Sequence, residues 1–234
     1  MATSAARTAL ITGGTGWLGS AVTTVFLAAG WRVVVPWLAE SEVGRLAEHE
    51  NLHLVQADLF DPASARSVVG LATAEPAAAL RAVVNLVGGF AAGGRVHETD
   101  VDEFEHQLRL NLRPTYLVSQ AALPAMIEAG GGAIVCVSSR AALRPFSGAA
   151  GYITGKAAVL ALVDAMAEEY RDDGIRVNAV LPSVIDTPAN RASMPDADHS
   201  RWVQPREIAD VILALCQEET SAVSGAHVPV YGKA

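Results

Sequence analysis

Short apolar, often β-branched runs alternate along the chain with longer helical segments. The pattern predicts strands at 8–12, 32–35, 52–57, 82–87, 133–138, 176–181 and 227–230. It predicts helices at 17–29, 42–48, 62–71, 101–129, 152–172 and 205–218. Most strand runs are continuously apolar, so helices should cover both faces of the sheet. We expect an α/β fold of the Rossmann type, a doubly wound parallel sheet of about seven strands.

The chain has no Ser-, Gly- or Pro-rich linker that would separate two domains. Residues 1–234 are therefore expected to form one domain. The longest stretch without a predicted element is 182–204. Because long loops in compact domains often cover binding sites, we expect it to be a substrate-binding lid.

Composition narrows the possible partners. The 234 residues are 51% hydrophobic and 18% charged, which is typical of a folded protein. A net charge of −8 disfavours nucleic acid as a partner. We expect no signal peptide and no apolar stretch that approaches the roughly 20 residues of a membrane span. Cys136 and Cys216 lie among apolar residues without CxxC spacing, so a reducing cytoplasm is the expected location.

A glycine-rich turn follows the first predicted strand. Residues 12–19 read TGGTGWLG, in which Gly14, Gly16 and Gly19 satisfy GxGxxG between a strand and a helix. In this motif the glycines serve the tight turn, the approach of a pyrophosphate and the packing of the helix on the strand. The residues expected to contact a dinucleotide here are Gly13, Gly14, Thr15, Gly16, Trp17, Leu18 and Gly19.

Residues after the second and third strands bear on the adenosine half of the cofactor. The second strand ends at Trp37, where an acid would select NAD and a base NADP. Glu40 and Glu42 follow closely and no arginine lies in the glycine turn, which favours NAD. Asp58, followed by Leu59, is placed to reach an adenine amino group. An equally good interpretation of Asp58 is a helix-start residue.

The second half of the chain holds candidate proton-transfer groups. Tyr152 and Lys156 are four positions apart on a predicted helix, so their side chains share a face. A phenol has a pKa of about 10, and a neighbouring ammonium is expected to lower it. Ser139 lies at the carboxyl end of a predicted strand, where open α/β sheets bind ligands. Its hydroxyl is expected to hold a substrate oxygen beside the phenol.

The sequence resembles the short-chain dehydrogenase/reductase superfamily over nearly the whole chain. The resemblance is carried by the glycine turn, the NLVGG segment at 85–89, Asn111, Ser139 and the Tyr152–Lys156 pair. The resemblance implies NAD or NADP as cofactor and a small-molecule substrate. Two departures are present: Ser183 replaces a glycine of the PGxxxT segment, and the middle glycine of the turn is one position early.

The resemblance also implies roles for individual residues. Tyr152 would donate or accept the proton, and Lys156 would lower its pKa and hold the nicotinamide ribose. Ser139 would orient the substrate, and Asn111 would anchor a water relay to Lys156. Further cofactor contacts would come from Asn85, Gly88, Tyr152, Lys156, Pro182, Ile185 and Thr187. The family likeness implies a homodimer or homotetramer through the long helices at 101–129 and 152–172.

A narrower likeness involves three stretches, 13–19, 87–94 and 181–202, which resemble the dihydropteridine reductases. Phe90 aligns with an aromatic residue beside the pterin, which makes it a substrate-contact candidate with Ser139 and Tyr152. Against this likeness, those enzymes lack a serine at the position of Ser139 and carry an acid at the position of Trp37. The alternatives are a carbonyl, secondary-alcohol or 3-oxoacyl reductase, and a non-catalytic nicotinamide-binding regulator.

The sequence HENLH at 49–53 spells the metalloprotease motif HExxH. A zinc site of this kind needs both histidines on one helix face and a third ligand. The segment instead passes from a predicted helix end into a predicted strand, so no metal site is expected.

Overall fold

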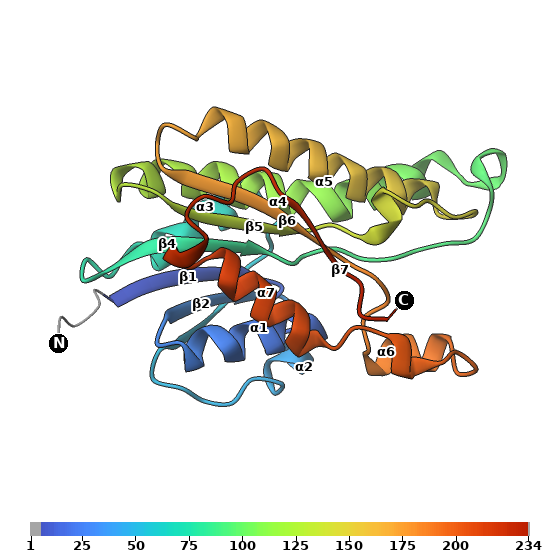
Figure 1. Cartoon of the computed structure of the whole chain (residues 1–234), viewed down its shortest axis with the longest axis horizontal. Helices are drawn as coiled ribbons and strands as arrows, with labels where there is room; N and C mark the ends of the chain where they lie inside the picture. The colour runs from blue at the N-terminus through green and yellow to red at the C-terminus, as the bar shows by residue number, and fades with distance from the viewer. Residues whose placement is uncertain (1–5, 234) are drawn as a thin grey trace.

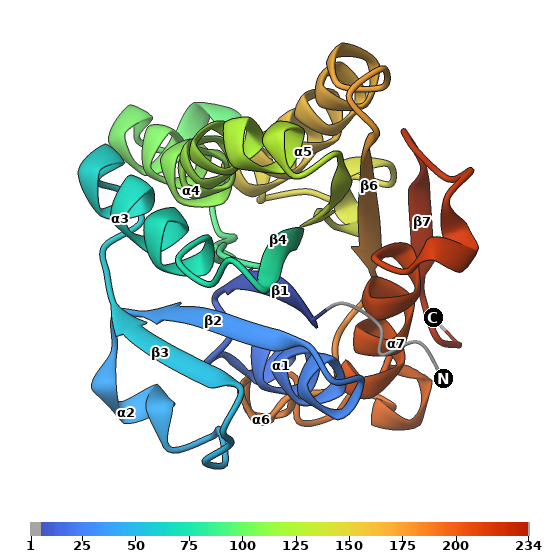
Figure 2. The same cartoon turned by 90° about the vertical axis from the view of Figure 1, so that its left-hand side faces the viewer.

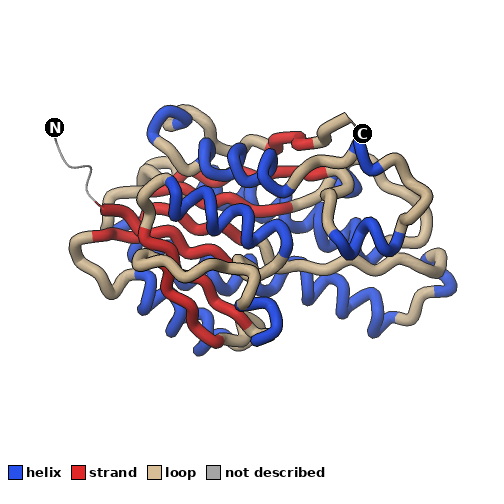
Figure 3. The backbone as a smooth tube through the Cα atoms, turned by 90° about the horizontal axis from the view of Figure 1, so that it is seen from below, coloured by secondary structure: helices blue, strands red, loops and turns tan. Residues whose placement is uncertain are grey.

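The structure is a computed structural model, and it describes residues 6–233. Seven parallel strands form one sheet in the order β3-β2-β1-β4-β5-β6-β7 (Figures 2 and 3). The strands are β1 (Ala6–Thr12), β2 (Arg32–Trp37), β3 (Leu52–Gln56), β4 (Ala78–Asn85), β5 (Gly132–Val137), β6 (Ile175–Pro182) and β7 (His227–Val230). The predicted Rossmann-type sheet is confirmed.

Helices cover both faces of this sheet, as the sequence predicts (Figures 1 and 2). Helices α3, α4 and α5 pack on one face, and α1 and α7 pack on the other. The helices are α1 (Trp17–Ala28), α2 (Glu40–Val43), α3 (Pro62–Ala72), α4 (Val101–Glu128), α5 (Ala150–Glu169), α6 (Pro188–Ser193) and α7 (Pro205–Leu215).

The strand sequences are continuously apolar because successive side chains of a strand point to opposite faces of the sheet, and both faces are buried under helices. On β1, Leu10 belongs to the core beneath α3–α5, while Ala9 and Ile11 belong to the core beneath α1 and α7. All three are fully buried. A strand that alternated polar and apolar residues would place polar groups in one of the two layers.

The order of the strands creates a crevice at the carboxyl edge of the sheet. The chain runs outward from β1 to β2 and β3, then returns to pair β4 with the other side of β1, with Thr12 beside Asn85. Loops that follow β1 and β4 therefore diverge to opposite faces. Ligands of open α/β sheets bind at such a switch point.

Two predicted segments differ from the structure. The helix expected at 42–48 is only the short α2, which ends at Val43 because Gly44 follows, and glycine is a poor helix former. The segment 182–204 contains α6 and a 3₁₀ turn at His199–Arg201. The signal for α6 is present in the sequence, since Thr187 caps the helix and Pro188 occupies its first turn.

Helix α5 corrects the expectation that no apolar stretch reaches the length of a membrane span. This 20-residue helix is long and apolar enough to cross a membrane by length and composition alone, because its most apolar window has a mean hydropathy of 1.3. It packs against α4 and lies over β5 and β6. Burial on two sides within the fold explains its apolar character.

Candidate active site

The glycine-rich turn joins β1 to α1 and fits a pyrophosphate. Gly13 has a φ of +65° and so makes the tight turn, which we expected of Gly14. A Cβ on Gly14 would lie 2.7 Å from Cγ1 of Val35, so this glycine instead lets the turn pack on β2. A Cβ on Gly19 would collide with the Gly13 carbonyl, which confirms the packing role of the third glycine.

The start of α1 provides hydrogen-bond donors at this turn. Its N-cap, Gly16, supplies no side-chain hydrogen bond. The first N–H groups of the helix, at Trp17 and Leu18, therefore point out of the helix end without a side-chain acceptor. Such an end favours a phosphate group.

An arginine that sequence reasoning did not identify reaches the turn. Arg45 Nη1 donates to the Thr15 carbonyl at 3.0 Å, and the guanidinium lies 4.6 Å from the centroid of the Trp17 ring. Its ion pair with Glu42 measures 3.0 Å, and Thr15 Oγ1 donates to the same carboxylate at 3.1 Å. The turn therefore does have a nearby arginine. It comes from the segment after α2, which no motif in the turn could indicate.

Asp58 and Leu59 follow β3. Asp58 is exposed and accepts a hydrogen bond from the Phe60 N–H at 2.9 Å. The N-cap of α3 is Asp61, which accepts from Ser64 N at 2.8 Å, so the interpretation of Asp58 as the helix cap is wrong. Leu59 is buried in the core, and its side chain does not face solvent.

Ser139, Tyr152 and Lys156 come together beyond the carboxyl end of β5. Ser139 caps the 3₁₀ turn Arg140–Ala142 by accepting from Ala141 N at 3.1 Å. Tyr152 is half-buried in the first turns of α5, where burial raises the pKa of its phenol and the neighbouring Ser139 hydroxyl acts to lower it. Lys156 is only 6% exposed, and its Nζ donates to the Val137 carbonyl at 3.1 Å. The predicted trio forms one cluster.

The titration of this cluster differs from the expectation. Burial raises the pKa of Tyr152, and the Ser139 hydrogen bond opposes that rise in part. Burial lowers the pKa of Lys156 to about 8. The pKa shift of Tyr152 therefore follows from burial and from Ser139, and the ammonium of Lys156 is not among its causes.

Asn111 and Lys156 flank the loop after β4. The buried amide of Asn111 donates to the Gly89 carbonyl at 3.0 Å and accepts from Gly89 N at 3.2 Å. A Cβ on Gly88 would lie 2.7 Å from Asn111 Oδ1 and 2.9 Å from Lys156 Nζ. Gly88 therefore leaves open the space between these two polar groups, which fits a small polar group at the predicted position of the ribose.

Asn85 sits deeper than the cofactor loop. Its Nδ2 donates to Ser119 Oγ on α4 at 3.1 Å, and the residue is 2% exposed. Its Oδ1 has no hydrogen-bond partner within residues 6–233. The side chain joins β4 to α4 and thereby supports the loop from below.

Two phenylalanines extend from the phenol of Tyr152 as a chain of aromatic contacts. The Phe90 ring meets the Tyr152 ring edge-on, with centroids 5.0 Å apart. Phe146 lies 6.3 Å from Phe90. Both phenylalanines are largely exposed, at 63% and 49%. Sequence reasoning missed Phe146, although its place between Ser139 and Tyr152 in the chain was an available signal.

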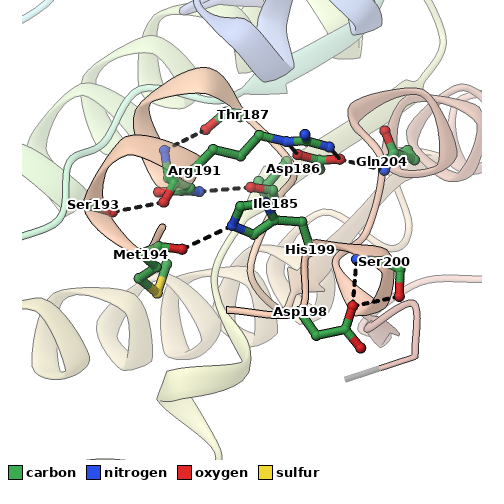
Figure 4. A network of polar contacts seen from close by, with 11 residues as sticks. Ile185, Asp186, Thr187, Arg191, Ser193, Met194, Asp198, His199, Ser200 and Gln204 are labelled. Atoms are coloured by element: carbon green, nitrogen blue, oxygen red, sulfur yellow. Dashed lines mark hydrogen bonds and ion pairs between the residues drawn. The ribbon is translucent and has the colours of Figure 1, made fainter. Parts of the chain in front are cut away.

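The segment 182–204 is tied together at its two ends (Figure 4). Ile185 pairs with Val203 as an isolated bridge, and Asp186 N donates to the Val203 carbonyl at 2.9 Å. The Asp186 carboxylate accepts from Arg191 Nη2 at 2.7 Å and from Gln204 Nε2 at 2.8 Å. These hydrogen bonds hold the pKa of Asp186 well below its usual range.

Other predicted residues of this segment have structural partners. Pro182 is buried at the end of β6. Ser183, at the position of the expected glycine, donates from Oγ to the Tyr231 carbonyl at 2.8 Å. Thr187 Oγ1 accepts from Asn190 N at 3.2 Å and caps α6, which leaves its hydroxyl hydrogen available. Trp37 is half-buried at the end of β2.

The histidines of the HExxH sequence do not share a helix. His49 precedes β3 and His53 lies within it. Within residues 6–233, no group of three His, Cys, Asp or Glu side chains is placed to hold a metal ion.

Comparisons with known proteins show the family of this chain. Residues 16–232 match the profile of the family described as Enoyl-(Acyl carrier protein) reductase. The chain is 32% identical to 2-(R)-hydroxypropyl-CoM dehydrogenase of Xanthobacter autotrophicus, over 97% of both chains. It is 33% identical to trans-4-hydroxycyclohexanecarboxylate dehydrogenase of Sinomonas cyclohexanicum, over 97% of this chain and 92% of that enzyme.

A solved structure described as ElxO with NADP bound is similar with a TM-score of 0.89 and 25% identity, over 97% of this chain and 98% of that one. The relatives are named for substrates other than a dihydropteridine. The glycine turn, the Ser139–Tyr152–Lys156 cluster and these matches lead to one conclusion: this chain is an NAD(P)-dependent oxidoreductase and belongs to the short-chain dehydrogenase/reductase superfamily.

Proposed function

We propose that the enzyme interconverts a secondary alcohol and a ketone on a ring-shaped substrate. The observation that carries this proposal is the exposed pair Phe90–Phe146, of which Phe90 packs edge-on against the Tyr152 ring. Exposed aromatic rings beside the proton donor favour a flat or cyclic apolar body over a flexible polar chain. A relative named for a cyclohexane alcohol gives further support.

In the proposed mechanism Tyr152 and Ser139 both hydrogen-bond to the substrate oxygen. During reduction Tyr152 gives its proton to that oxygen, while Ser139 stabilises the negative charge that develops there. The nicotinamide of the bound cofactor supplies or accepts the hydride. Lys156, beside Gly88, would hold the nicotinamide ribose, and Asn111 would keep the Gly88–Gly89 loop in place.

The remaining predicted contacts belong to the same proposal. The backbone of the glycine turn and the start of α1 would hold the pyrophosphate, and Asp58 would approach the adenine. Ile185 and Thr187 would hold the carboxamide, with 182–204 as the lid over the substrate. A dihydropteridine-like acceptor is the second candidate, because Phe90 also suits a flat heterocycle.

The test is a comparison of substrates in wild type, Phe90→Ala and Phe146→Ala. Cyclic ketones, acyclic ketones, a 3-oxoacyl thioester and quinonoid dihydropterin would each be reduced under the same conditions. We expect cyclic ketones to give the highest kcat/KM, and each alanine variant to raise their KM by roughly 3- to 10-fold, from the loss of an aromatic contact. Leu54→Ala, on β3, is the control. Highest kcat/KM with the dihydropterin would select the second candidate, and a preference for acyclic substrates would contradict both.

We further propose that the enzyme prefers NAD. The hydrogen bond from Thr15 holds Glu42 against the turn, where its carboxylate would bond the 2′-hydroxyl of the adenosine ribose. Arg45 is already engaged by Glu42, Thr15 and Trp17. Parallel assays with NADH and NADPH should therefore give a higher kcat/KM with NADH, and Glu42→Gln should reduce that preference. A wild-type preference for NADPH that Arg45→Gln abolishes would contradict this assignment and identify Arg45 as the ligand of a 2′-phosphate.

A further inference from the structure

A hollow lies at the amino-terminal ends of the strands, on the opposite side of the sheet from the catalytic cluster. Its volume is about 470 Å³. Arginines near the amino ends of three strands line it: Arg7 of β1, Arg81 of β4 and Arg176 of β6. All strands are parallel, so this edge is distant from Ser139 and Tyr152, which follow the carboxyl ends of the strands.

Local structure holds each arginine in the wall of the hollow. The pairing of β1 with β4 passes from Thr8–Leu80 to Ala9–Ala82, so Arg81 is the extra residue of a bulge, a feature that redirects a side chain. Its Nη1 donates to the Gly131 carbonyl at 2.9 Å. The Arg7 guanidinium lies 4.2 Å from the centroid of the buried Trp31 ring.

Arg176 has a mainly structural role. It donates to the Leu215 and Gln217 carbonyls at 2.8 and 3.1 Å, at the carboxyl end of α7. Burial lowers its pKa. It contributes positive charge to the hollow but few free hydrogen-bond donors.

The hollow combines positive charge with unused donors. Within residues 6–233, none of the three arginines forms an ion pair, and Glu218 is the only acid in the lining. Arg7 makes no side-chain hydrogen bond to the described residues, and Arg81 makes one. A guanidinium has five N–H donors in a geometry that matches carboxylate and phosphate. The buried indole N–H of Trp31, another lining residue, also lacks a partner in the described chain.

We propose that this hollow binds a small organic anion through phosphate or carboxylate groups, at a site separate from the active site. Arg7 and Arg81 are its principal ligands, and the buried Trp31 ring supports the Arg7 guanidinium from behind. The volume is within the range of small-molecule sites and exceeds what a single inorganic phosphate fills. Three arginines in one hollow are notable in a chain of net charge −8.

Thermal unfolding at constant ionic strength tests the proposal, with inorganic pyrophosphate and citrate as separate probes, each measured without NADH and with NADH at saturation. We expect at least one probe to raise Tm in a saturable way, and Arg7→Gln and Arg81→Gln each to weaken its apparent affinity by roughly 10-fold, the loss of a charge-assisted contact. Arg206→Gln, on the exposed face of α7, should leave it unchanged.

The two probes separate the sources of the anion. A response to pyrophosphate alone supports a phosphate ligand, and a response to citrate alone supports a carboxylate ligand. The proposal is overturned when neither probe gives a saturable response, or when the affinity is the same in all variants. A pyrophosphate response that NADH abolishes and both substitutions spare also overturns it, because that response belongs to the glycine turn.

Discussion

At the scale of single residues, Lys156 carries an ammonium group into the protein interior. Its one hydrogen bond within the described chain goes to the Val137 carbonyl, and its pKa falls to about 8 from an ordinary 10.5. The folded chain therefore binds fewer protons at Lys156 than the unfolded chain between these two values. The contribution of Lys156 to the free energy of unfolding therefore rises with pH between about 8 and 10.5.

We expect the difference in free energy of unfolding between wild type and Lys156→Met to change with pH. Below pH 8 the buried charge costs wild type on the order of 3 kcal/mol relative to the neutral side chain, and this cost disappears as the pH approaches 10.5. Denaturant unfolding at several pH values measures it. Lys233→Met, at an exposed position, should show no such trend. A constant difference for Lys156→Met would contradict the burial of a charged lysine.

Gly88→Ala tests the space between Asn111 and Lys156. The new Cβ would lie 2.7 Å from Asn111 Oδ1, so the amide or the loop must move. We expect a loss of about 1–3 kcal/mol in stability and a raised KM for the coenzyme. Gly70→Ala, whose Cβ meets nothing within 4 Å on α3, should be neutral or stabilising. Equal behaviour of the two variants would show that Gly88 is not confined.

The residue types at the catalytic positions were predictable from spacing, but their titration was not. The YxxxK spacing places Tyr152 and Lys156 on one helix face whatever the rest of the fold does. The pKa of each group depends on how deeply it is buried, which is a property of packing. Arg45 was unpredictable for a related reason, since its approach to Thr15 depends on where the chain turns after α2.

At the scale of elements, the segment 182–204 is a short helix and a turn closed at the base by Asp186. The carboxylate joins Arg191 inside the segment to Gln204 at its end. The sequence indicated a long loop there because no apolar periodicity extends over it. The strands, by contrast, were predictable to within a few residues, because their continuous apolar runs reflect burial on both faces.

Asp186→Asn should loosen this segment. The amide cannot form the ion pair with Arg191, so we expect faster proteolytic cleavage within 188–201 and a higher KM for the substrate, with a smaller change in kcat. Asp210→Asn, which removes the exposed Arg206–Asp210 ion pair on α7, is the matched control. Unchanged cleavage and an unchanged KM in Asp186→Asn would show that the Asp186–Arg191 ion pair does not hold the lid segment in place.

At the scale of the whole molecule, the carboxyl ends and the amino ends of the parallel strands carry different groups of functional side chains. The carboxyl edge gathers the glycine turn, Asn111 and the Ser139–Tyr152–Lys156 cluster. The arginines of the hollow lie toward the amino ends of the strands, where Arg176 donates hydrogen bonds to carbonyl groups at the end of α7. The parallel, doubly wound sheet followed from the alternation of strands and helices in the sequence, whereas the arginine-lined hollow depends on a bulge that no sequence pattern indicated.

The outer surface of α4 and α5 is consistent with the proposed homodimer or homotetramer. Tyr116 and Ile127 on α4 are 49% and 39% exposed. We expect sedimentation velocity at micromolar concentration to give two or four chains, and Tyr116→Glu to reduce that mass. Leu54→Glu on β3 should not. A monomeric wild type would contradict the assembly.

The most direct test of the catalytic assignment is the substitution Tyr152→Phe, with turnover and coenzyme binding measured on the same preparation. Loss of the proton donor should lower kcat by roughly 10²- to 10⁴-fold, while the Kd for reduced coenzyme changes by less than about twofold. Tyr170→Phe, at the end of α5, should retain full turnover. Undiminished turnover in Tyr152→Phe would contradict the assignment of this phenol as the proton donor.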